Sequence, residues 1–256
     1  QTDSYRRIRN TFRYLIGNLD GFTNEEKIDK NNFPDLEKFI LHRLWEVDKT
    51  IQECVKTFNF HLMFTTLLNF CSNDLSAFYF DIRKDVIYCD GKKSIERRSA
   101  RTLLDIIFNY LVRWFAPSLS FTTEEAWKSR NNDSSIHLED FLIAPENYKN
   151  YEVNDIWITL KQIRKVITGA LEKKRADKII GSSLEAHIDI YLEKSILEKI
   201  KNYQLDEISI TSSFALHEIN SNSHGFSLEE VSDVKVEVSK TSGQKCQRCW
   251  KYKTQL

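Results

Sequence analysis

Residues 5–21, YRRIRNTFRYLIGNLDG, show most clearly which class of fold the chain adopts. Apolar side chains recur there at steps of three and four residues, at Tyr5, Ile8, Phe12, Leu15, Ile16 and Leu19. This spacing places them on one face of an α-helix, and Gly21 stands where such a helix would end. The stretch therefore predicts an amphipathic helix that packs against other elements through a single apolar face.

The same helical period continues to about residue 130. Pro117 interrupts it, because proline cannot continue a helix, and Thr122 to Glu125 offer capping residues for a short resumption. The expected helices cover residues 5–19, 36–51, 60–79, 94–116 and a short continuation through 127. Four or five helices with short links predict an antiparallel helical bundle over residues 1–150.

The pattern changes in the second half of the chain. Residues 134–154 are loop-like and precede a further helix at about 153–175, whereas residues 184–192 alternate between apolar and polar, which is typical of a strand. Further strands are expected at 208–210, 214–216 and 234–238, with a helix at 196–203 and a polar link at 220–227. We therefore expect a linker helix and a small α/β module over 151–240, followed by an incomplete zinc-binding knuckle over 241–256.

The overall composition indicates a soluble intracellular protein. Hydrophobic residues make up 41% of the chain, and 37 basic residues balance 37 acidic ones. No apolar run is long enough to span a membrane, so no membrane association is expected. Five cysteines are an odd number for a disulfide framework and favour the reducing cytoplasm. The chain lacks an initial Met and enters a helix by Tyr5, so we expect a fragment of a longer protein.

Motifs of common catalytic sites are missing from the sequence. It contains no glycine-rich phosphate loop, no His-Glu-x-x-His and no Gly-x-Ser-x-Gly, and its six histidines are scattered. His187 falls in the alternating stretch, where a hydrogen-bonded structural histidine is expected. We therefore expect no catalytic residue in this chain.

Two groups of arginines are candidates for RNA contact. In the first helix Arg6, Arg9, Asn10 and Arg13 fall within one arc beside the apolar face. Arginine binds phosphate through two parallel hydrogen bonds and stacks on exposed bases, although an ordinary solvated helix face would have the same pattern. The second group opens the fourth helix and consists of Arg97, Arg98 and Arg101. Nearby carboxylates, Glu96 and Asp105, favour neutralisation of this second group by helix-spaced pairing.

The most specific local motif is Cys246-Gln-Arg-Cys249-Trp250. Two cysteines at this spacing provide two of the four thiolates of a structural zinc site. A redox pair would need a thioredoxin-like unit, and two ordinary thiols are the other alternative.

Nine stretches, in order, resemble the anticodon-binding region of bacterial-type isoleucyl-tRNA synthetases. They are YRRIRNT (5–11), GNLDGF (17–22), FYFDIRKD (78–85), RSARTLLD (98–105), the WFAP to EEAW stretch (114–127), SIHL (135–138), ALEKKR (170–175), GSSLEA (181–186) and KCQRCW (245–250). The resemblance covers nearly the whole chain, and its last two motifs are specific for the bacterial isoleucyl type.

The resemblance implies a helical bundle, a small α/β module and a zinc-binding end that bind the anticodon stem-loop of tRNA(Ile). Cys246 and Cys249 would form half of a four-cysteine zinc site whose other half is expected beyond Leu256, with Arg248 and Trp250 facing RNA. The parent enzyme would use ATP and Mg²⁺ to join isoleucine to its tRNA.

The His-x-Gly-His and Lys-Met-Ser-Lys-Ser signatures of the family's ATP site are missing here, as is its editing domain. The chain is therefore expected to bind tRNA without charging it, as part of a monomer in which it contacts the catalytic domain. The alternative is a helical scaffold that binds protein with no RNA specificity.

Overall fold

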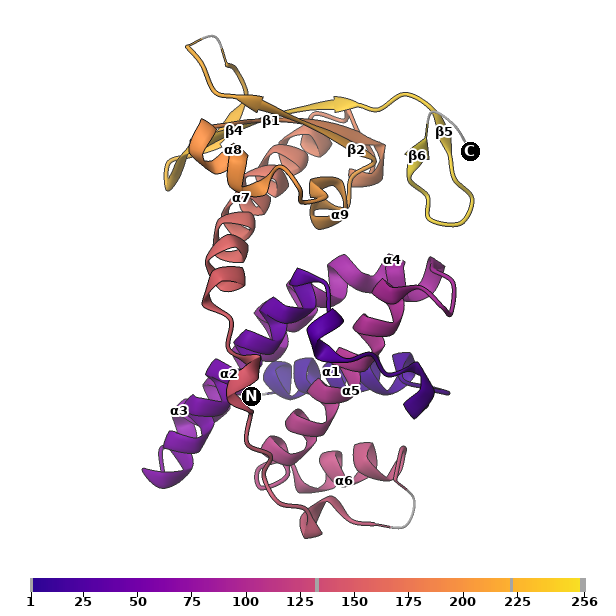
Figure 1. The fold of residues 1–256 in the computed structure, drawn as a ribbon, viewed down its shortest axis with the longest axis vertical. Helices are drawn as coiled ribbons and strands as arrows, with labels where there is room; N and C mark the ends of the chain where they lie inside the picture. The colour runs from indigo at the N-terminus through magenta and orange to yellow at the C-terminus, as the bar shows by residue number, and fades with distance from the viewer. Residues whose placement is uncertain (1, 132–133, 222, 254–256) are drawn as a thin grey trace. The chain divides into compact units, whose positions relative to one another are not determined.

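The structure is a computed structural model that describes residues 2–131, 134–221 and 223–253. Its residues form two compact units, divided between Val153 and Asn154 (Figure 1). The first unit is helical, and the second combines helices with a small sheet. The predicted order, a mainly helical chain with a small α/β module toward its C-terminal end, is confirmed.

The helical unit contains the α-helices α1 to α6, together with short 3₁₀ turns and one stretch of π-helix. In chain order the elements are α1 (Thr2–Asn18), η1 (Asn24–Glu26), η2 (Lys30–Asn32), α2 (Asp35–Lys56), α3 (Phe60–Asn69), η3 (Phe70–Phe80), α4 (Asp81–Cys89), α5 (Ile95–Phe115), α6 (Ser120–Lys128), η4 (Ile136–Leu138) and η5 (Glu146–Tyr148). The predicted helices at 5–19, 36–51 and 94–116 correspond to α1, α2 and α5.

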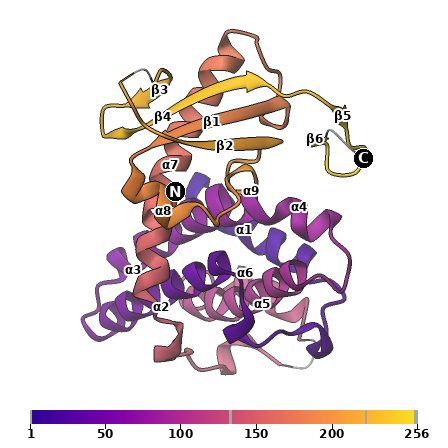
Figure 2. The ribbon, with the colours of Figure 1, turned by 45° about the horizontal axis from the view of Figure 1, so that its top comes forward.

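Helix α5 forms the centre of this unit and is buried on most of its sides. It begins at Ile95 and is capped by Ser94, whose hydroxyl accepts a hydrogen bond from the Arg97 backbone N–H. Helices α1, α2, α4 and α6 all contact it, and Figure 2 shows it among them. Phe12 of α1 meets Phe108 and Phe115 of α5 edge-on, which confirms the apolar face predicted for the first helix.

The third predicted helix continues for longer than expected. Helices α3 and α4 are joined without a break by η3, a stretch of π-helix whose turns are wider than those of an α-helix. The prediction ended this helix at residue 79 because the wider turns disrupt the regular spacing of apolar residues.

A buried ion pair joins α4 to α2. Arg83 donates from Nε and Nη2 to the two carboxylate oxygens of Glu37, at 2.7 and 2.8 Å. The Tyr79 hydroxyl donates to the same carboxylate at 3.0 Å. Because Glu37 is fully buried, these partners are needed to stabilise its charge.

The loop after α6 is attached to α2 by two buried acceptors. The backbone N–H of Ala144 donates to Asp48 Oδ2, and that of Asn150 donates to His42 Nδ1, both at 3.0 Å. The prediction of a loop before the next helix is confirmed, and the loop's path is fixed by these contacts.

The second unit holds a four-stranded sheet in the order β2-β1-β4-β3. Its elements are α7 (Tyr151–Ala176, beginning just before the boundary), η6 (Ser183–Glu185), β1 (Ala186–Leu192), α8 (Lys194–Ile200), α9 (Leu205–Ser209), β2 (Ser213–Glu218), β3 (Phe226–Leu228), β4 (Val231–Lys240), β5 (Gln244–Lys245) and β6 (Tyr252–Lys253). Strands β1 and β2 are parallel, so α8 and α9 form the crossover between them, whereas β4 is antiparallel to β1 and β3.

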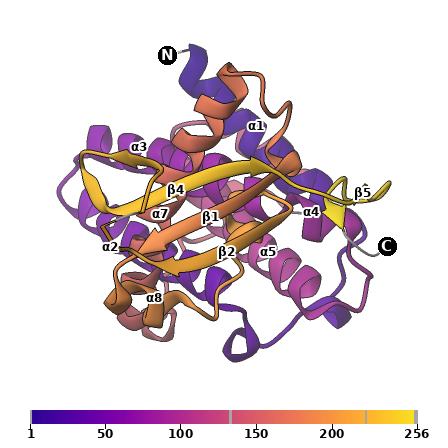
Figure 3. The same ribbon diagram turned by 90° about the horizontal axis from the view of Figure 1, so that it is seen from above.

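The helices of this unit lie on one side of the sheet (Figures 1 and 3). Alternate residues of β1, including Ile188 and Ile190, are buried, while His187, Asp189 and Tyr191 point to the other face and are partly exposed. Figure 3 shows β1, β2 and β4 with no helix in front of them. The alternation predicted for residues 184–192 is confirmed, and it leaves one polar face of the sheet open.

Two expectations for this unit are wrong. Residues 208–210 are not a strand: Ile208 lies in α9, and Ile210 ends that helix with a left-handed backbone, φ 56°. The β-branched isoleucines favoured a strand, and a five-residue helix is too short to show a helical period. In addition, the expected polar link at 220–227 overlaps a strand, since β3 begins at Phe226. The Phe226 ring packs against α7 at Gly169, which leaves room for it.

Candidate functional site

The arginine face predicted on α1 is exposed. Arg6, Arg9, Asn10 and Arg13 are all solvent-accessible, while Ile8 on the opposite side of the helix is buried. Arg6, Asn10 and Arg13 have no side-chain hydrogen bond or ion pair within residues 2–131, 134–221 and 223–253. We call these four residues the arginine flank.

Arg9 differs from its neighbours because it is paired across to α6. Its two terminal nitrogens donate to the two carboxylate oxygens of Glu125, at 3.0 and 3.2 Å. These hydrogen bonds lower the pKa of Glu125, so the pair is charged at neutral pH. Tyr5 Oη and Thr122 Oγ1, 3.1 Å apart, form a second link between the two helices.

Beside the arginine flank is a groove of about 400 Å³ between α1 and α6. It is lined by Arg9, Phe12, Arg13, Ile16, Gly17, Thr122, Glu125, Ala126 and Ser129. A methyl group added at Gly17 would meet no atom within 4 Å, so the groove is open there. An apolar floor with guanidinium groups at its rim suits an unstacked base, with phosphates at the arginines.

The second arginine group points into the fold. Arg101 donates to the Glu26 carboxylate and to the backbone carbonyls of Asn18 and Asp20, and it is 5% exposed. Arg98 donates to three successive carbonyls of residues 25–27, and Arg97 donates to the carbonyl of Ile87. These residues hold the segment after α1 in place, and RNA contact would require the release of these bonds.

Residues 244–253 form a tight hairpin. Gln244 pairs with Lys253 and Lys245 with Tyr252, and the Cys246 backbone N–H donates to the Lys251 carbonyl at 2.9 Å. The turn closes with Trp250 in a left-handed conformation, φ 63°.

The turn of this hairpin favours the thiolate form of Cys246. Backbone N–H groups of Cys249 and Arg248 point at its sulfur and lower the pKa of this thiol to about 7. By contrast, complete burial raises the pKa of the Cys71 thiol to about 12. Trp250 is 61% exposed with the Lys245 ammonium 5.1 Å from its ring centre, which suits a ring that stacks on a partner.

Among the described residues of this hairpin, Cys246 and Cys249 are the side chains of the types that commonly bind zinc. Across the described ranges, no group of three or more His, Cys, Asp or Glu side chains is placed to hold a metal ion. Cys246 and Cys249 therefore fit half of a four-thiolate zinc site.

Sequence reasoning missed the contribution of α6 to the groove. The sequence predicts Thr122 to Glu125 only as capping residues, yet Glu125 pairs with Arg9 and Glu124 accepts hydrogen bonds from the Ser135 hydroxyl and the Ile136 N–H. A pairing across 116 positions leaves no local signal in a single sequence.

Among the described residues, no helix combines the length and the apolar character needed to cross a membrane.

The helical unit agrees with the family to which the chain can be assigned. Residues 37–190, more than half of the chain, match the family model for the anticodon-binding domain of tRNA ligase. The chain belongs to this family.

Curated relatives narrow the similarity to one type of tRNA ligase. The chain is 47% identical over 253 residues to the isoleucine–tRNA ligase of Pelagibacter ubique (strain HTCC1062), a match that covers 97% of the chain and 27% of that protein. It is 43% identical over 252 residues to the isoleucine–tRNA ligase of Bartonella henselae and 41% identical over 256 residues to that of Agrobacterium fabrum, covering 98% and 99% of the chain. The chain thus spans about a quarter of the length of these relatives.

Proposed function

We propose that this chain is the anticodon-binding region of an isoleucine–tRNA ligase and holds tRNA(Ile) by its anticodon stem-loop. The rest of the ligase would carry out the ATP- and Mg²⁺-dependent joining of isoleucine to the tRNA, in the cytoplasm and as a monomer. Identity of 47% over almost the whole chain supports this assignment. The chain would contribute binding energy and orientation, with no residue taking part in the chemical step.

The arginine flank beside the groove is the observation that carries the proposal. Arg6 and Arg13 are exposed with no acidic partner among the described residues, and Arg13 lines a groove with an apolar floor. Phosphate contacts would position the RNA, while a base from the loop would stack in the groove. Arg97, Arg98 and Arg101 would instead act indirectly, by fixing residues 18–27 next to α1.

The hairpin at residues 244–253 would serve as the second contact with the loop. The proposed segments of the chain are 1–150, 151–240 and 241–256. The last of these would bind zinc through Cys246 and Cys249, together with two further ligands from outside the described residues. When bound, zinc would fix the hairpin turn, and Arg248 and Trp250 would be presented to RNA.

An apolar tip on the helical unit favours an additional protein contact. Phe58, in the turn after α2, and Phe60, the first residue of α3, are 77% and 58% exposed, and their rings meet edge-on at 6.2 Å. Leu62 adds to this patch. Exposed apolar clusters of this kind are typical of protein interfaces, and the catalytic domain of the same ligase is the proposed partner. This observation would also fit a protein-binding scaffold, which the following experiment separates from an RNA-binding role.

The test is a binding titration with an isoleucine-specific anticodon stem-loop at several salt concentrations. A stem-loop of the same stem with altered anticodon bases is the matched control. An anticodon-binding region should prefer the isoleucine loop, and its affinity should fall steeply with salt because phosphate contacts release counterions. Absence of salt-sensitive binding to either RNA would contradict the proposal and favour the scaffold. Equal binding to both loops would mean that the chain positions the RNA backbone without distinguishing the anticodon bases.

A further inference from the structure

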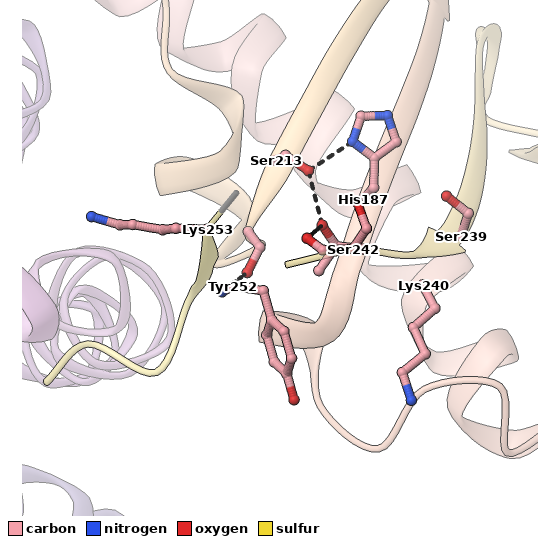
Figure 4. A pocket seen from close by; sticks show the side chains of 9 residues that line it. His187, Ser213, Ser239, Lys240, Ser242, Tyr252 and Lys253 are labelled. Carbon is pink, nitrogen blue, oxygen red and sulfur yellow. Dashed lines mark hydrogen bonds between the residues drawn. The ribbon is translucent and has the colours of Figure 1, made fainter. Parts of the chain in front are cut away.

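A second hollow lies within the C-terminal unit, at the end of its sheet (Figure 4). Its volume is about 670 Å³, which is larger than the groove at α1. It is lined by His187, Ser212, Ser213, Ser239, Lys240, Thr241, Ser242, Tyr252 and Lys253. None of these side chains is acidic, and five are hydroxyl-bearing serines or threonine. We call this hollow the hydroxyl pocket.

Hydrogen bonds fix the walls of the hydroxyl pocket. The hairpin forms one wall, and it is tied to the sheet by the Tyr252 N–H, which donates to Ser212 Oγ at 2.7 Å. The Lys251 ammonium lies 2.9 Å from Asp206 Oδ2 and fastens the same hairpin to α9. On the strand side, His187 Nδ1 and Ser213 Oγ are 2.7 Å apart. The pocket is therefore preformed within this unit.

Several donors in the hydroxyl pocket are not used by the fold. In the part of the chain that the structure describes, the hydroxyls of Ser239, Ser242 and Tyr252 have no hydrogen-bond partner, and neither has the Lys253 ammonium. Lys240 has only a long contact of 3.9 Å with Glu185. Hydroxyl donors in one hollow with ammonium groups at its edges suit a ligand rich in anionic and hydroxyl oxygens.

The C-terminal segment that lines part of the hydroxyl pocket is basic. The sequence from Val238 to its last residue contains no Asp or Glu, although the whole chain is neutral. Its basic residues are Lys240, Lys245, Arg248, Lys251 and Lys253. In Figure 4, Lys240 and Tyr252 extend toward the same side of the pocket, whereas Lys253 extends away from it on the hairpin side. Lys240 and Lys253 thus flank the pocket on different sides.

We propose that the hydroxyl pocket binds the sugar-phosphate backbone of single-stranded RNA. Successive phosphates would lie near Lys240 and Lys253, and the ribose between them would meet the hydroxyls of Ser239 and Ser242. A compact anion fits less well, because the cations flank the pocket and its volume exceeds that of a phosphate ion. This inference rests on the proposed tRNA-binding function and adds a backbone site in the second unit.

The test compares the chain with its Lys240→Ala/Lys253→Ala variant, using the isoleucine anticodon stem-loop as probe. Lys199→Ala, an exposed lysine on α8 outside the pocket, is the matched control. Loss of two phosphate contacts should weaken binding roughly tenfold and reduce the slope of log affinity against log salt by about 1.4, at roughly 0.7 per contact with single-stranded RNA. Lys199→Ala should change neither quantity.

Outcomes separate this inference from the function on which it rests. If the unchanged chain binds the stem-loop with steep salt dependence but the double variant matches it, the hydroxyl pocket is not a backbone site, while the proposed function stands. If the unchanged chain shows no salt-sensitive binding, both fail.

A second pair of variants avoids any change of charge. Ser239→Ala/Ser242→Ala should reduce the preference for the RNA stem-loop over a DNA of the same sequence, because the 2′-hydroxyl loses its partners. An unchanged preference would exclude contact with the ribose. Displacement of the stem-loop by inorganic phosphate at millimolar concentration would likewise overturn the proposal in favour of a compact-anion site.

Discussion

Arg9 of α1 and Glu125 of α6 are 116 positions apart in the sequence and form two hydrogen bonds, of 3.0 and 3.2 Å. The pair fixes the width of the groove between these helices, and it also neutralises one of the three cations of the arginine flank. Arg6 and Arg13, about one helical turn to either side, have no such partner among the described residues. Arg9 is thus committed to the fold, while its neighbours are available to a ligand.

Replacement of Glu125 by glutamine should therefore strengthen tRNA binding. The change removes a negative charge from the groove and releases the Arg9 guanidinium, and we expect an affinity gain of roughly two- to fivefold, the range of an exposed ion pair. Anisotropy titration of a labelled anticodon stem-loop measures this. Asp3→Asn, which releases Arg7 outside the flank, is the matched control and should change affinity less. A loss of affinity in Glu125→Gln would mean that groove width matters more than free charge.

Simultaneous replacement of Arg6, Arg9 and Arg13 by alanine should weaken tRNA binding roughly five- to hundredfold, because charged hydrogen bonds to phosphate are lost. The double variant Arg6→Ala/Arg13→Ala should account for most of this loss, since Arg9 is already paired. Thermal unfolding should change little, as these side chains are exposed. Unchanged affinity in both variants would remove the α1 face from the binding site.

Arg101→Ala should act on stability. It leaves the Glu26 carboxylate and the carbonyls of Asn18 and Asp20 without their donor, and we expect a loss of about 1–3 kcal/mol in the free energy of unfolding. Denaturant titration measures this loss. Stability equal to that of the unchanged chain, combined with weaker RNA binding, would return Arg101 to the set of direct RNA contacts.

Trp114→Ala should destabilise the helical unit by about 3–5 kcal/mol, because a fully buried indole leaves a cavity that the surrounding core cannot fill. Trp114→Phe is the conservative control and should cost less. Trp127→Ala should act in the same direction, as its ring is buried and its Nε1 donates to Ser134 Oγ at 2.9 Å. Calorimetric melting tests this. If folded variants bound tRNA more weakly at full stability, these rings would have a direct binding role.

Metal binding by the chain alone should be weak. Cys246 and Cys249 provide two thiolates where a structural zinc site has four ligands, so cobalt(II) should bind loosely and be removed by EDTA. Cys246→Ser/Cys249→Ser should abolish the thiolate-to-cobalt absorption, and Cys54→Ser should leave it unchanged. EDTA should not lower the melting temperature, because Tyr252 and Lys251 tie the hairpin to its unit without metal. Tight binding of one metal ion per chain would contradict the half-site.

The sequence was most informative where structure is local and periodic. The apolar steps of α1 and the alternation of β1 each predicted an element and its buried face correctly. It was less informative where geometry departs from a fixed period, as in η3, or where an element is too short to show one, as in α9.

The candidate site residues show a similar contrast between what local structure determines and what depends on distant parts of the sequence. The exposure of the arginine flank follows from helix geometry, and the structure agrees with it. That Arg9 is paired while Arg6 is not depends on α6, which lies more than a hundred residues away in the sequence. The hydroxyl pocket likewise combines β1, β2, the end of β4 and the hairpin, and no single stretch of sequence carries its pattern.

The π-helical stretch between Phe70 and Phe80 makes this part of the chain unusually sensitive to its length. A change of one residue in its length, with the wider turns otherwise kept, would shift everything that follows around the helix axis. Each residue turns by about 100° in an α-helix and by less in the wider π-helix, so the part after the change would rotate by roughly a quarter of a turn. Arg83 would then face away from Glu37, whose carboxylate is fully buried. A one-residue length change, which a surface loop absorbs easily, would here leave an unpaired charge in the core.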